Sequence, residues 1–170
     1  DITENEYFEM IKNKTAVLIG CSYMFGGIVA ETNTSNTDLL YKIGLNLGIA
    51  FQLEDDLLDC FGDQEKFGKK TGGDIIEKKK TLLFIYTHSQ LELDKKSEFE
   101  NIFYSSDLQE SEKITSIISF YENSGAVNYL KNKVKKHFNK AESLINDLQI
   151  DNDIKIKLNQ FSKTLLNREI

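Results

Sequence analysis

The sequence predicts an all-α fold, and two observations support this prediction. The chain of 170 residues contains no proline, although an average share of about 5% would give roughly eight. Because proline interrupts helices, its absence favours long helices without breaks. Apolar residues also recur at helical spacing over most of the chain. One such stripe consists of Ile114, Ile117, Ile118 and Tyr121.

Two helices are expected before residue 31. Thr3 can cap the first, and Glu6, three residues later, completes a capping box. This short amphipathic helix is expected to break near residues 12–13. The second helix is expected at about residues 14–30, and it is apolar almost throughout apart from its first residues.

The third helix is expected to start at a cap formed by Thr37 or Asp38 and to run to about Cys60. It contains Gly44 and Gly48, four residues apart. Glycine weakens a helix, but two glycines on one face let another helix or a substrate approach the backbone closely.

The rest of the chain is expected to be a helical scaffold. A loop at residues 63–76 precedes a helix at about residues 81–91, and residues 94–107 are expected to form a short helix between turns. Three further helices are expected, at about residues 108–123, 125–148 and 151–166. The sequence shows no internal repeat and no linker, so residues 1–170 are expected to form a single domain.

The composition excludes several classes of protein. The formal net charge of −6 argues against a nucleic-acid-binding protein, which would normally present a basic face. No apolar run reaches about 18 residues, so no transmembrane helix is expected. Cys21 and Cys60 form no metal-binding or disulfide pattern, and they are expected to be free thiols of a cytoplasmic protein.

Three aspartates in the third helix form a DDxxD pattern: Asp55, Asp56 and Asp59. Asp55 and Asp59 lie one turn apart on one face, together with Gln52. The helix is apolar around much of its remaining circumference, so these carboxylates are expected to sit inside a cleft. Carboxylates buried together repel one another, and a divalent cation such as Mg²⁺ would relieve that repulsion. A solvated acidic surface is the alternative interpretation.

The segment after this helix is rich in glycine and lysine. Gly68, Gly72 and Gly73 occur with Lys69 and Lys79, which suits a mobile flap over an anion. The alternative is a solvated, flexible connection, as lysine-rich loops usually are.

Three other residues have a structural and a functional interpretation. Lys14 opens an apolar helix, so it is either a surface residue at a helix end or an ammonium group delivered to an anion. His88 and His137 have no cysteine or carboxylate at metal-ligand spacing, and each is expected to be a satisfied or surface side chain.

Several motifs occur together in an order typical of one family. In chain order they are Tyr7-x3-Ile11-x2-Lys14-Thr15-Ala16-x-Leu18, Gly44-x3-Gly48-x2-Phe51-Gln52-x2-Asp55-Asp56-x2-Asp59, Gly68-Lys69, Gly72-Gly73-Asp74 and Lys79-x-Thr81. Together they strongly resemble the trans-isoprenyl diphosphate synthases, or polyprenyl synthetases, over about residues 7–83.

The resemblance implies a helical bundle of the isoprenoid synthase fold with a central cleft. Members of this family hold Mg²⁺ ions, which Mn²⁺ can replace, between two aspartate-rich motifs and an allylic diphosphate. Ionisation of the allylic ester gives a carbocation, isopentenyl diphosphate attacks it, and loss of a proton completes the longer diphosphate.

The resemblance also implies roles for individual residues. Asp55 and Asp59 would bind Mg²⁺, with Asp56 as a further ligand or as a support for the other two. Lys14 and Lys69 would contact the diphosphate, and Lys79 would close over it. Thr15 and Gln52 would lie near the allylic centre, and Phe51 would line the pocket. The expected catalytic residues are Lys14, Thr15, Gln52, Asp55 and Lys69.

The chain departs from the family pattern at its start. The first aspartate-rich motif and the segment that grips isopentenyl diphosphate lie upstream of the lysine–threonine motif, and nothing in residues 1–13 resembles them. The chain therefore resembles the C-terminal half of a synthase, and we expect it to be inactive alone. Loss of half a bundle would expose apolar faces at residues 21–30 and 43–58, so a homodimer is expected.

Two other functions have to be weighed. A non-catalytic partner or regulatory subunit of a synthase would also lack the first motif, and this alternative stays open. A terpene cyclase would need a second metal motif of the form N/D-D-x-x-S/T-x3-E. The sequence after Asn146 and Asp147 does not continue in that way, so the cyclase interpretation is disfavoured.

Overall fold

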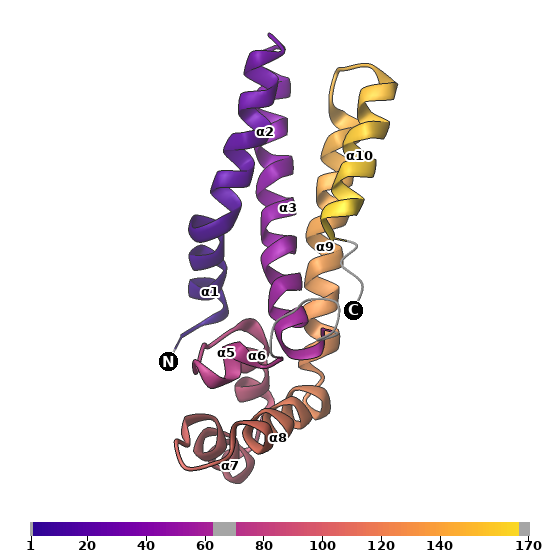
Figure 1. The fold of residues 1–170 in the computed structure, drawn as a ribbon. Helices are drawn as coiled ribbons and strands as arrows, with labels where there is room; N and C mark the ends of the chain where they lie inside the picture. The colour runs from indigo at the N-terminus through magenta and orange to yellow at the C-terminus, as the bar shows by residue number, and fades with distance from the viewer. Residues whose placement is uncertain (1, 63–70, 167–170) are drawn as a thin grey trace. The chain divides into compact units, whose positions relative to one another are not determined.

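The computed structural model describes residues 2–62 and 71–166, and within these ranges every regular element is a helix. The elements, in chain order, are α1 (Glu4–Ile11), the π-helix η1 (Lys12–Ala16), α2 (Val17–Val29), α3 (Thr34–Phe61), α5 (Gly73–Ile76), α6 (Leu82–Gln90), α7 (Leu93–Tyr104), α8 (Glu110–Asn123), α9 (Ala126–Asp147) and α10 (Asn152–Leu166) (Figure 1). None of the described helices is long and apolar enough to cross a membrane. The predicted all-α class is confirmed.

The first helix begins as the sequence predicts. The Thr3 N–H donates to Glu6 Oε2 at 2.8 Å, and the Glu6 N–H donates to Thr3 Oγ1 at 3.3 Å, which is the expected capping box. The predicted break at residues 12–13 is wrong. The backbone widens there into η1, whose turns hold more residues than α-helical turns, and it continues directly into α2.

The start of α3 differs from the prediction. The Asn36 N–H donates to Asn33 Oδ1 at 2.8 Å, which is the hydrogen bond of a helix N-cap, and α3 begins at Thr34. Thr37 and Asp38 are therefore not the cap, because Asn33 already satisfies the first turn. Within the predicted loop at residues 63–76, Gly73–Ile76 form the short helix α5.

The chain divides into two compact units. Among the described residues, unit 1 comprises residues 2–7, 55–62 and 71–131, and unit 2 comprises residues 8–54 and 132–166. The division falls inside α1, α3 and α9, so each of these helices contributes to both units.

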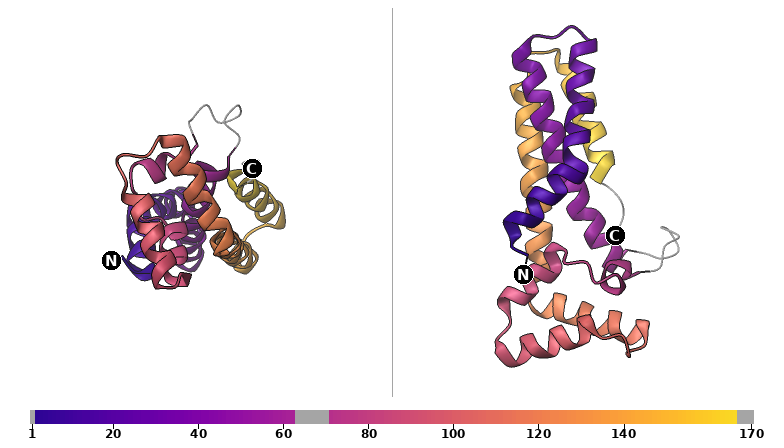
Figure 2. Two further views of the ribbon diagram at one scale, coloured as in Figure 1. Left: turned by 90° about the horizontal axis from the view of Figure 1, so that it is seen from below. Right: turned by 90° about the vertical axis from the view of Figure 1, so that its left-hand side faces the viewer.

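Unit 2 is held together by packing of α3 on α9. The buried cluster at its centre consists of Ile43, Leu47, Ala141, Leu144, Ile145 and Leu148. Helices α2 and α10 run alongside these two helices, as Figure 1 and the right-hand view of Figure 2 show. Because α9 covers Ile43 and Leu47, the predicted exposure of an apolar face at residues 43–58 is wrong.

The two glycines of α3 serve helix packing within unit 2. A Cβ on Gly44 would lie 2.7 Å from the Gly20 Cα, and a Cβ on Gly48 would lie 2.5 Å from the Ala16 Cα. No side chain fits at these distances, so the backbone of α3 lies directly against the backbones of η1 and α2. Of the two predicted uses of these glycines, the close approach of a helix is the one observed.

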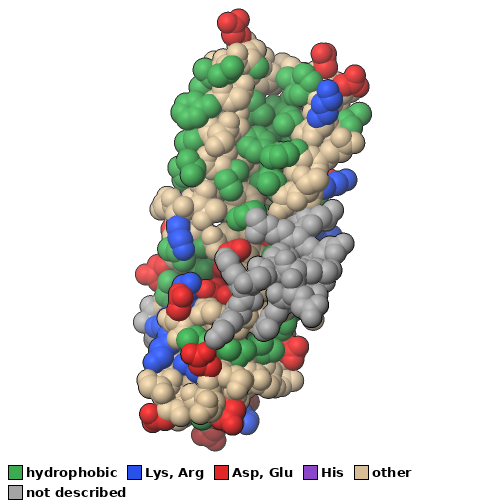
Figure 3. All heavy atoms as spheres, viewed as in Figure 1, with side chains coloured by type: hydrophobic (Ala, Val, Ile, Leu, Met, Phe, Trp, Pro, Cys, Tyr) green, Lys and Arg blue, Asp and Glu red, His purple; other side chains and the backbone are tan. Residues whose placement is uncertain are grey.

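One face of α2 is uncovered in unit 2. Leu18, Phe25 and Val29 share this face and are 72%, 58% and 83% exposed. Figure 3 shows hydrophobic side chains gathered along the helices of this unit. The predicted exposure of an apolar face at residues 21–30 is confirmed. We call Leu18, Phe25 and Val29 the α2 apolar face.

Unit 1 has an aromatic core formed by α6, α7 and α8. The Phe84 ring centroid lies 4.4 Å from that of Phe103 and 5.2 Å from that of Phe99. All three side chains are buried, as is Tyr121 of α8. Burial of several aromatic rings supplies much of the apolar area that this small unit needs.

Candidate functional site

The three aspartates of the DDxxD pattern lie near the C-terminal end of α3, in unit 1, and they differ in exposure. Asp55 is exposed, Asp59 is half-buried, and Asp56 is only 5% exposed. The predicted burial of all three carboxylates in a cleft is therefore wrong for Asp55. Helical spacing explains the difference, because Asp55 and Asp59 share one face whereas Asp56 points about 100° away from Asp55.

Asp56 is held by Tyr7 of α1. The Tyr7 hydroxyl donates to Asp56 Oδ2 at 2.5 Å, and Tyr7 is 1% exposed. Burial, together with the charge of Asp56, raises the pKa of Tyr7 far above its ordinary value. The phenol therefore keeps its proton and remains the donor. No sequence signal predicts this contact, because the two residues lie 49 positions apart.

Another carboxylate, that of Asp74, lies beside Asp59. Gly72 has a left-handed φ of +83°, which lets the chain turn into α5 at this point. The Gly72 N–H donates to the Asp59 carbonyl at 2.6 Å, and the Asp74 N–H donates to Asp59 Oδ2 at 2.9 Å. The sequence interpretation gives Asp74 no role, although the two glycines before it indicate such a turn. We call Asp55, Asp59 and Asp74 the carboxylate cluster.

The carboxylate cluster is electrostatically unfavourable without a cation. Burial raises the pKa of Asp59, and the charges of Asp74 and Asp55 raise it further. The Asp74 N–H and the charge of Lys79 act in the opposite direction without cancelling this effect. A cation placed at the cluster would favour the ionised carboxylates.

The donor atoms of the cluster fit a hard divalent cation, since Mg²⁺ and Mn²⁺ prefer carboxylate oxygens. Over residues 2–62 and 71–166, no three histidine, cysteine, aspartate or glutamate side chains converge closely enough to hold an ion by themselves. Asp55 and Asp59 would hold Mg²⁺, with water and phosphate oxygens completing its coordination, as is usual for this ion.

Lys79 follows α5 and is paired within its own segment. Its Nζ lies 2.8 Å from Asp74 Oδ1 and 2.8 Å from Glu77 Oε2, and these hydrogen bonds raise the pKa of Lys79 well above its usual value. The neighbouring Lys78 anchors the segment, because its Nζ donates to the Tyr104 carbonyl at 3.0 Å. Lys79 is therefore already paired with two carboxylates.

Thr15 and Gln52, the two residues expected near an allylic carbon, are in contact within unit 2. The Thr15 hydroxyl donates to Gln52 Oε1 at 2.9 Å. This contact is possible because η1, which carries Thr15, packs against α3 at Gly48, one turn before Gln52. Their predicted place near an allylic carbon stays a prediction.

The other predicted site residues are less informative. Lys14 is exposed and Phe51 is half-buried. Gly68 and Lys69 lie outside the described residues, so their predicted roles stay predictions.

Both histidines have hydrogen-bonding partners, as expected. His88 Nε2 lies 2.7 Å from Glu100 Oε1 in unit 1, and His137 Nδ1 lies 3.0 Å from Asn46 Oδ1 in unit 2. Neither partner is predictable from spacing, since each comes from a different helix.

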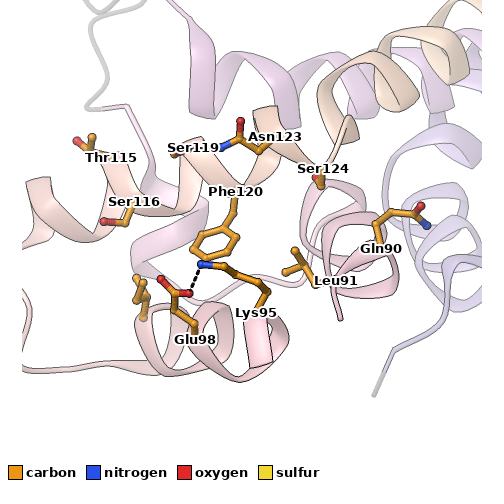
Figure 4. Close-up of a pocket in the computed structure, with 11 residues that line it drawn as sticks. Gln90, Leu91, Lys95, Glu98, Thr115, Ser116, Ser119, Phe120, Asn123 and Ser124 are labelled. Atoms are coloured by element: carbon orange, nitrogen blue, oxygen red, sulfur yellow. Dashed lines mark hydrogen bonds and ion pairs between the residues drawn. The ribbon is translucent and has the colours of Figure 1, made fainter. Parts of the chain in front are cut away.

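A separate cavity of about 810 Å³ lies between α7 and α8 in unit 1 (Figure 4). Hydroxyl and amide side chains surround Phe120 on its walls, and Lys95 and Glu98 form an ion pair there at 2.6 Å. The described residues that line it include none of the predicted site residues. Its neutral lining and internally paired charges do not suit a diphosphate, so the carboxylate cluster remains the candidate site.

Comparison with known proteins gives the family context of this site. Residues 1–121 match the model of a family described as polyprenyl synthetase. A geranylgeranyl diphosphate synthase from Sulfolobus acidocaldarius is 35% identical over 159 residues, which are 91% of this chain and 46% of that protein. The chain thus spans about half the length of the curated relatives it matches.

Solved structures show the same relation. A crystal structure of a geranylgeranyl pyrophosphate synthase matches all of this chain with a TM-score of 0.91 and 38% identity, and the match covers 53% of that protein. A geranylgeranyl pyrophosphate synthase from Corynebacterium glutamicum, solved with isoprenyl diphosphate and magnesium, matches 97% of this chain with a TM-score of 0.85 and 26% identity. That match covers 47% of the Corynebacterium protein. These similarities confirm the predicted fold.

Proposed function

Because the chain belongs to the polyprenyl synthetase family, we propose that it forms part of a prenyltransferase that condenses isopentenyl diphosphate with an allylic diphosphate. The C–O bond of the allylic diphosphate breaks, and pyrophosphate leaves with the bonding electrons. The double bond of isopentenyl diphosphate then attacks the allylic carbon, and a proton is lost. The observation that carries this proposal is the carboxylate cluster at the end of α3, within the family-matched part of the chain.

The carboxylate cluster would hold the pyrophosphate end of the allylic substrate. Asp55 and Asp59 would hold Mg²⁺, which would supply the positive charge that a leaving pyrophosphate needs. The magnesium in the related structure from Corynebacterium glutamicum supports this assignment. Asp74 keeps Lys79 beside the cluster, at 2.8 Å, where its ammonium group can move from a carboxylate to a phosphate oxygen. Lys14 and Lys69 are proposed as further cations on the diphosphate.

The Thr15–Gln52 pair would face the allylic carbon. The Thr15 hydroxyl donates a hydrogen bond to Gln52 Oε1, so the lone pairs of the Thr15 oxygen can point toward a developing positive charge. Such fixed dipoles stabilise charge without having to reorganise during the reaction. Phe51, the residue before Gln52, is proposed to line the pocket for the hydrocarbon chain.

The test is an aspartate substitution in a full-length synthase that carries this chain. Asp55→Ala should lower kcat for condensation of isopentenyl diphosphate with geranyl diphosphate by about a hundredfold or more, measured as product formed at saturating Mg²⁺. Asp38→Ala is the matched control, because Asp38 is an exposed aspartate on the same helix. Unchanged condensation in the Asp55→Ala variant would overturn the proposal.

We also propose that this chain corresponds to the C-terminal half of a synthase, located in the cytoplasm, and that it is inactive alone. The half-length match to relatives supports the assignment to one half of a synthase. The 170-residue chain should form no product from isopentenyl diphosphate and any allylic diphosphate. It should bind pyrophosphate weakly and only with Mg²⁺. Measurable turnover by the chain alone would contradict this part of the proposal.

A second candidate function is that of a non-catalytic partner or regulatory subunit of a synthase. The half-length match and the α2 apolar face favour it. The intact mass of the protein expressed from its native gene separates the two candidates. A mass near twice 19.5 kDa supports one half of a synthase, whereas a mass of 19.5 kDa together with a co-purifying synthase supports a subunit.

A further inference from the structure

The pairing of Tyr7 with Asp56 points to a further role for α1. We propose that Tyr7 is a positioning residue for the aspartate motif: by binding Asp56, it helps to orient Asp55 and Asp59, the two carboxylates proposed to face a divalent cation. This inference rests on the proposed function, because it assumes that the motif binds a metal ion.

The Tyr7–Asp56 pair is buried. Tyr7 is 1% exposed and Asp56 is 5% exposed, and the phenol hydroxyl lies 2.5 Å from Asp56 Oδ2. A buried carboxylate is costly unless a donor satisfies it. Because Tyr7 is such a donor, Asp56 is held in one rotamer and is the least accessible of the three aspartates.

The geometry of α3 links the directions of its three aspartates. Asp56 lies between Asp55 and Asp59 in sequence, so the rotation of α3 about its axis fixes all three directions together. Around the helix axis, Asp56 lies about 100° from Asp55 and about 60° from Asp59, so a bond that fixes Asp56 also sets the directions of the other two. Tyr7 therefore contributes to the orientation of Asp55 and Asp59. Supporting residues of this kind often change metal affinity about 10- to 100-fold when they are removed.

The structure also supplies a matched control. Tyr129 of α9 donates its hydroxyl to Glu4 Oε2 at 2.8 Å, within the same unit. This second tyrosine–carboxylate bond also ties α1 to unit 1, but it does not touch the aspartate motif. Tyr129→Phe thus removes an anchor of α1 without removing the contact to Asp56.

The experiment uses Mn²⁺ as a paramagnetic probe with inorganic pyrophosphate on the 170-residue chain. NMR line broadening of the aspartate side-chain carboxyl carbons reports binding even when affinity is weak. In the unsubstituted chain, Asp55 and Asp59 should broaden more strongly than Asp56. Tyr7→Phe should lower the Mn²⁺ affinity about tenfold or more, and Tyr129→Phe should leave it unchanged. Urea unfolding of both variants measures the loss of stability separately.

The outcomes separate the two proposals. Absence of broadening at Asp55 and Asp59 in the unsubstituted chain overturns the metal site of the proposed function, and the role of Tyr7 falls with it. If the Tyr7→Phe variant binds Mn²⁺ as tightly as the unsubstituted chain, only the role of Tyr7 is overturned. The same holds if Tyr129→Phe lowers the Mn²⁺ affinity as much as Tyr7→Phe does. If Tyr7→Phe does not fold, the pattern in the unsubstituted chain decides, because stronger broadening of Asp56 than of Asp55 contradicts the proposal.

Discussion

At the scale of single residues, burial acts on Asp59 and His137 in opposite directions. It raises the pKa of the Asp59 carboxyl and lowers the pKa of the His137 imidazole, since it disfavours the charged form of each. Lys136 and Lys133 lower the pKa of His137 further. In both residues the folded protein favours the neutral side chain. A bound cation would compensate the negative charges of Asp74 and Asp55 beside Asp59, whereas the charges that act on His137 are positive.

His137 should make unfolding depend on pH. Its folded pKa lies below the unfolded value of about 6.5, so the unfolded chain binds a proton first as the pH falls. Its contribution to the free energy of unfolding is therefore lost progressively as the pH falls below about 6.5. His137→Gln keeps an amide beside Asn46 and should flatten this dependence, measured by urea unfolding at about pH 7.5 and 5.5. An equal decline in both proteins would contradict the assignment.

At the scale of elements, the contact between α3 and the η1–α2 segment has no room for a side chain. Gly48→Ala places a Cβ about 2.5 Å from the Ala16 Cα, and relief of that overlap requires the backbones to separate. We expect a loss of about 2 kcal/mol in the free energy of unfolding, measured by urea denaturation.

Gly26 provides the control for this prediction. It also lies in a helix of unit 2, but a Cβ there would meet no atom within 4 Å. Gly26→Ala should therefore stabilise the chain by about 0.5–1 kcal/mol, because alanine loses less backbone entropy. Equal effects of the two substitutions would show that the close helix contact is not what makes Gly48 important.

Local patterns explain which elements could be predicted from the sequence. The capping box of Thr3 and Glu6 depends on residues three positions apart, and apolar periodicity locates most helices for the same reason. The π-helix was not predictable, because it depends on how residues 12–16 meet α3. The cap at Asn33 was missed because Asn33, Thr37 and Asp38 are all suitable cap residues.

In the candidate site, too, only the features that depend on local spacing could be predicted. The spacing of Asp55 and Asp59 places them on one face, and the structure agrees. The contact of Asp74 with Asp59 requires the left-handed turn at Gly72, and the burial of Asp56 requires Tyr7. Both depend on folding of distant segments, so neither follows from helical periodicity.

At the scale of the whole molecule, the α2 apolar face should drive self-association. Leu18, Phe25 and Val29 together expose apolar surface that a soluble monomer would normally cover. We expect concentration-dependent dimers in sedimentation velocity. Phe25→Glu should shift the chain toward monomer, because a charged side chain is costly to bury in an apolar contact.

Leu93 is the control for self-association. It is 80% exposed but lies on α7 in unit 1, whereas the α2 apolar face belongs to unit 2. Leu93→Glu should leave the sedimentation profile unchanged. A monomer at all concentrations, or equal dissociation by Phe25→Glu and Leu93→Glu, would contradict a dimer formed through α2.

The π-helix η1 makes the length of the chain at this point as important as its side chains. Within unit 2, it lets Thr15 bond to Gln52 while Phe8, seven residues earlier, lies against the His137 ring with centroids 5.9 Å apart. Removal of the exposed Asn13 would let the segment wind into an ordinary α-helix and rotate Phe8 away from its partner by about one residue's turn. Natural variation should therefore preserve the number of residues in this segment.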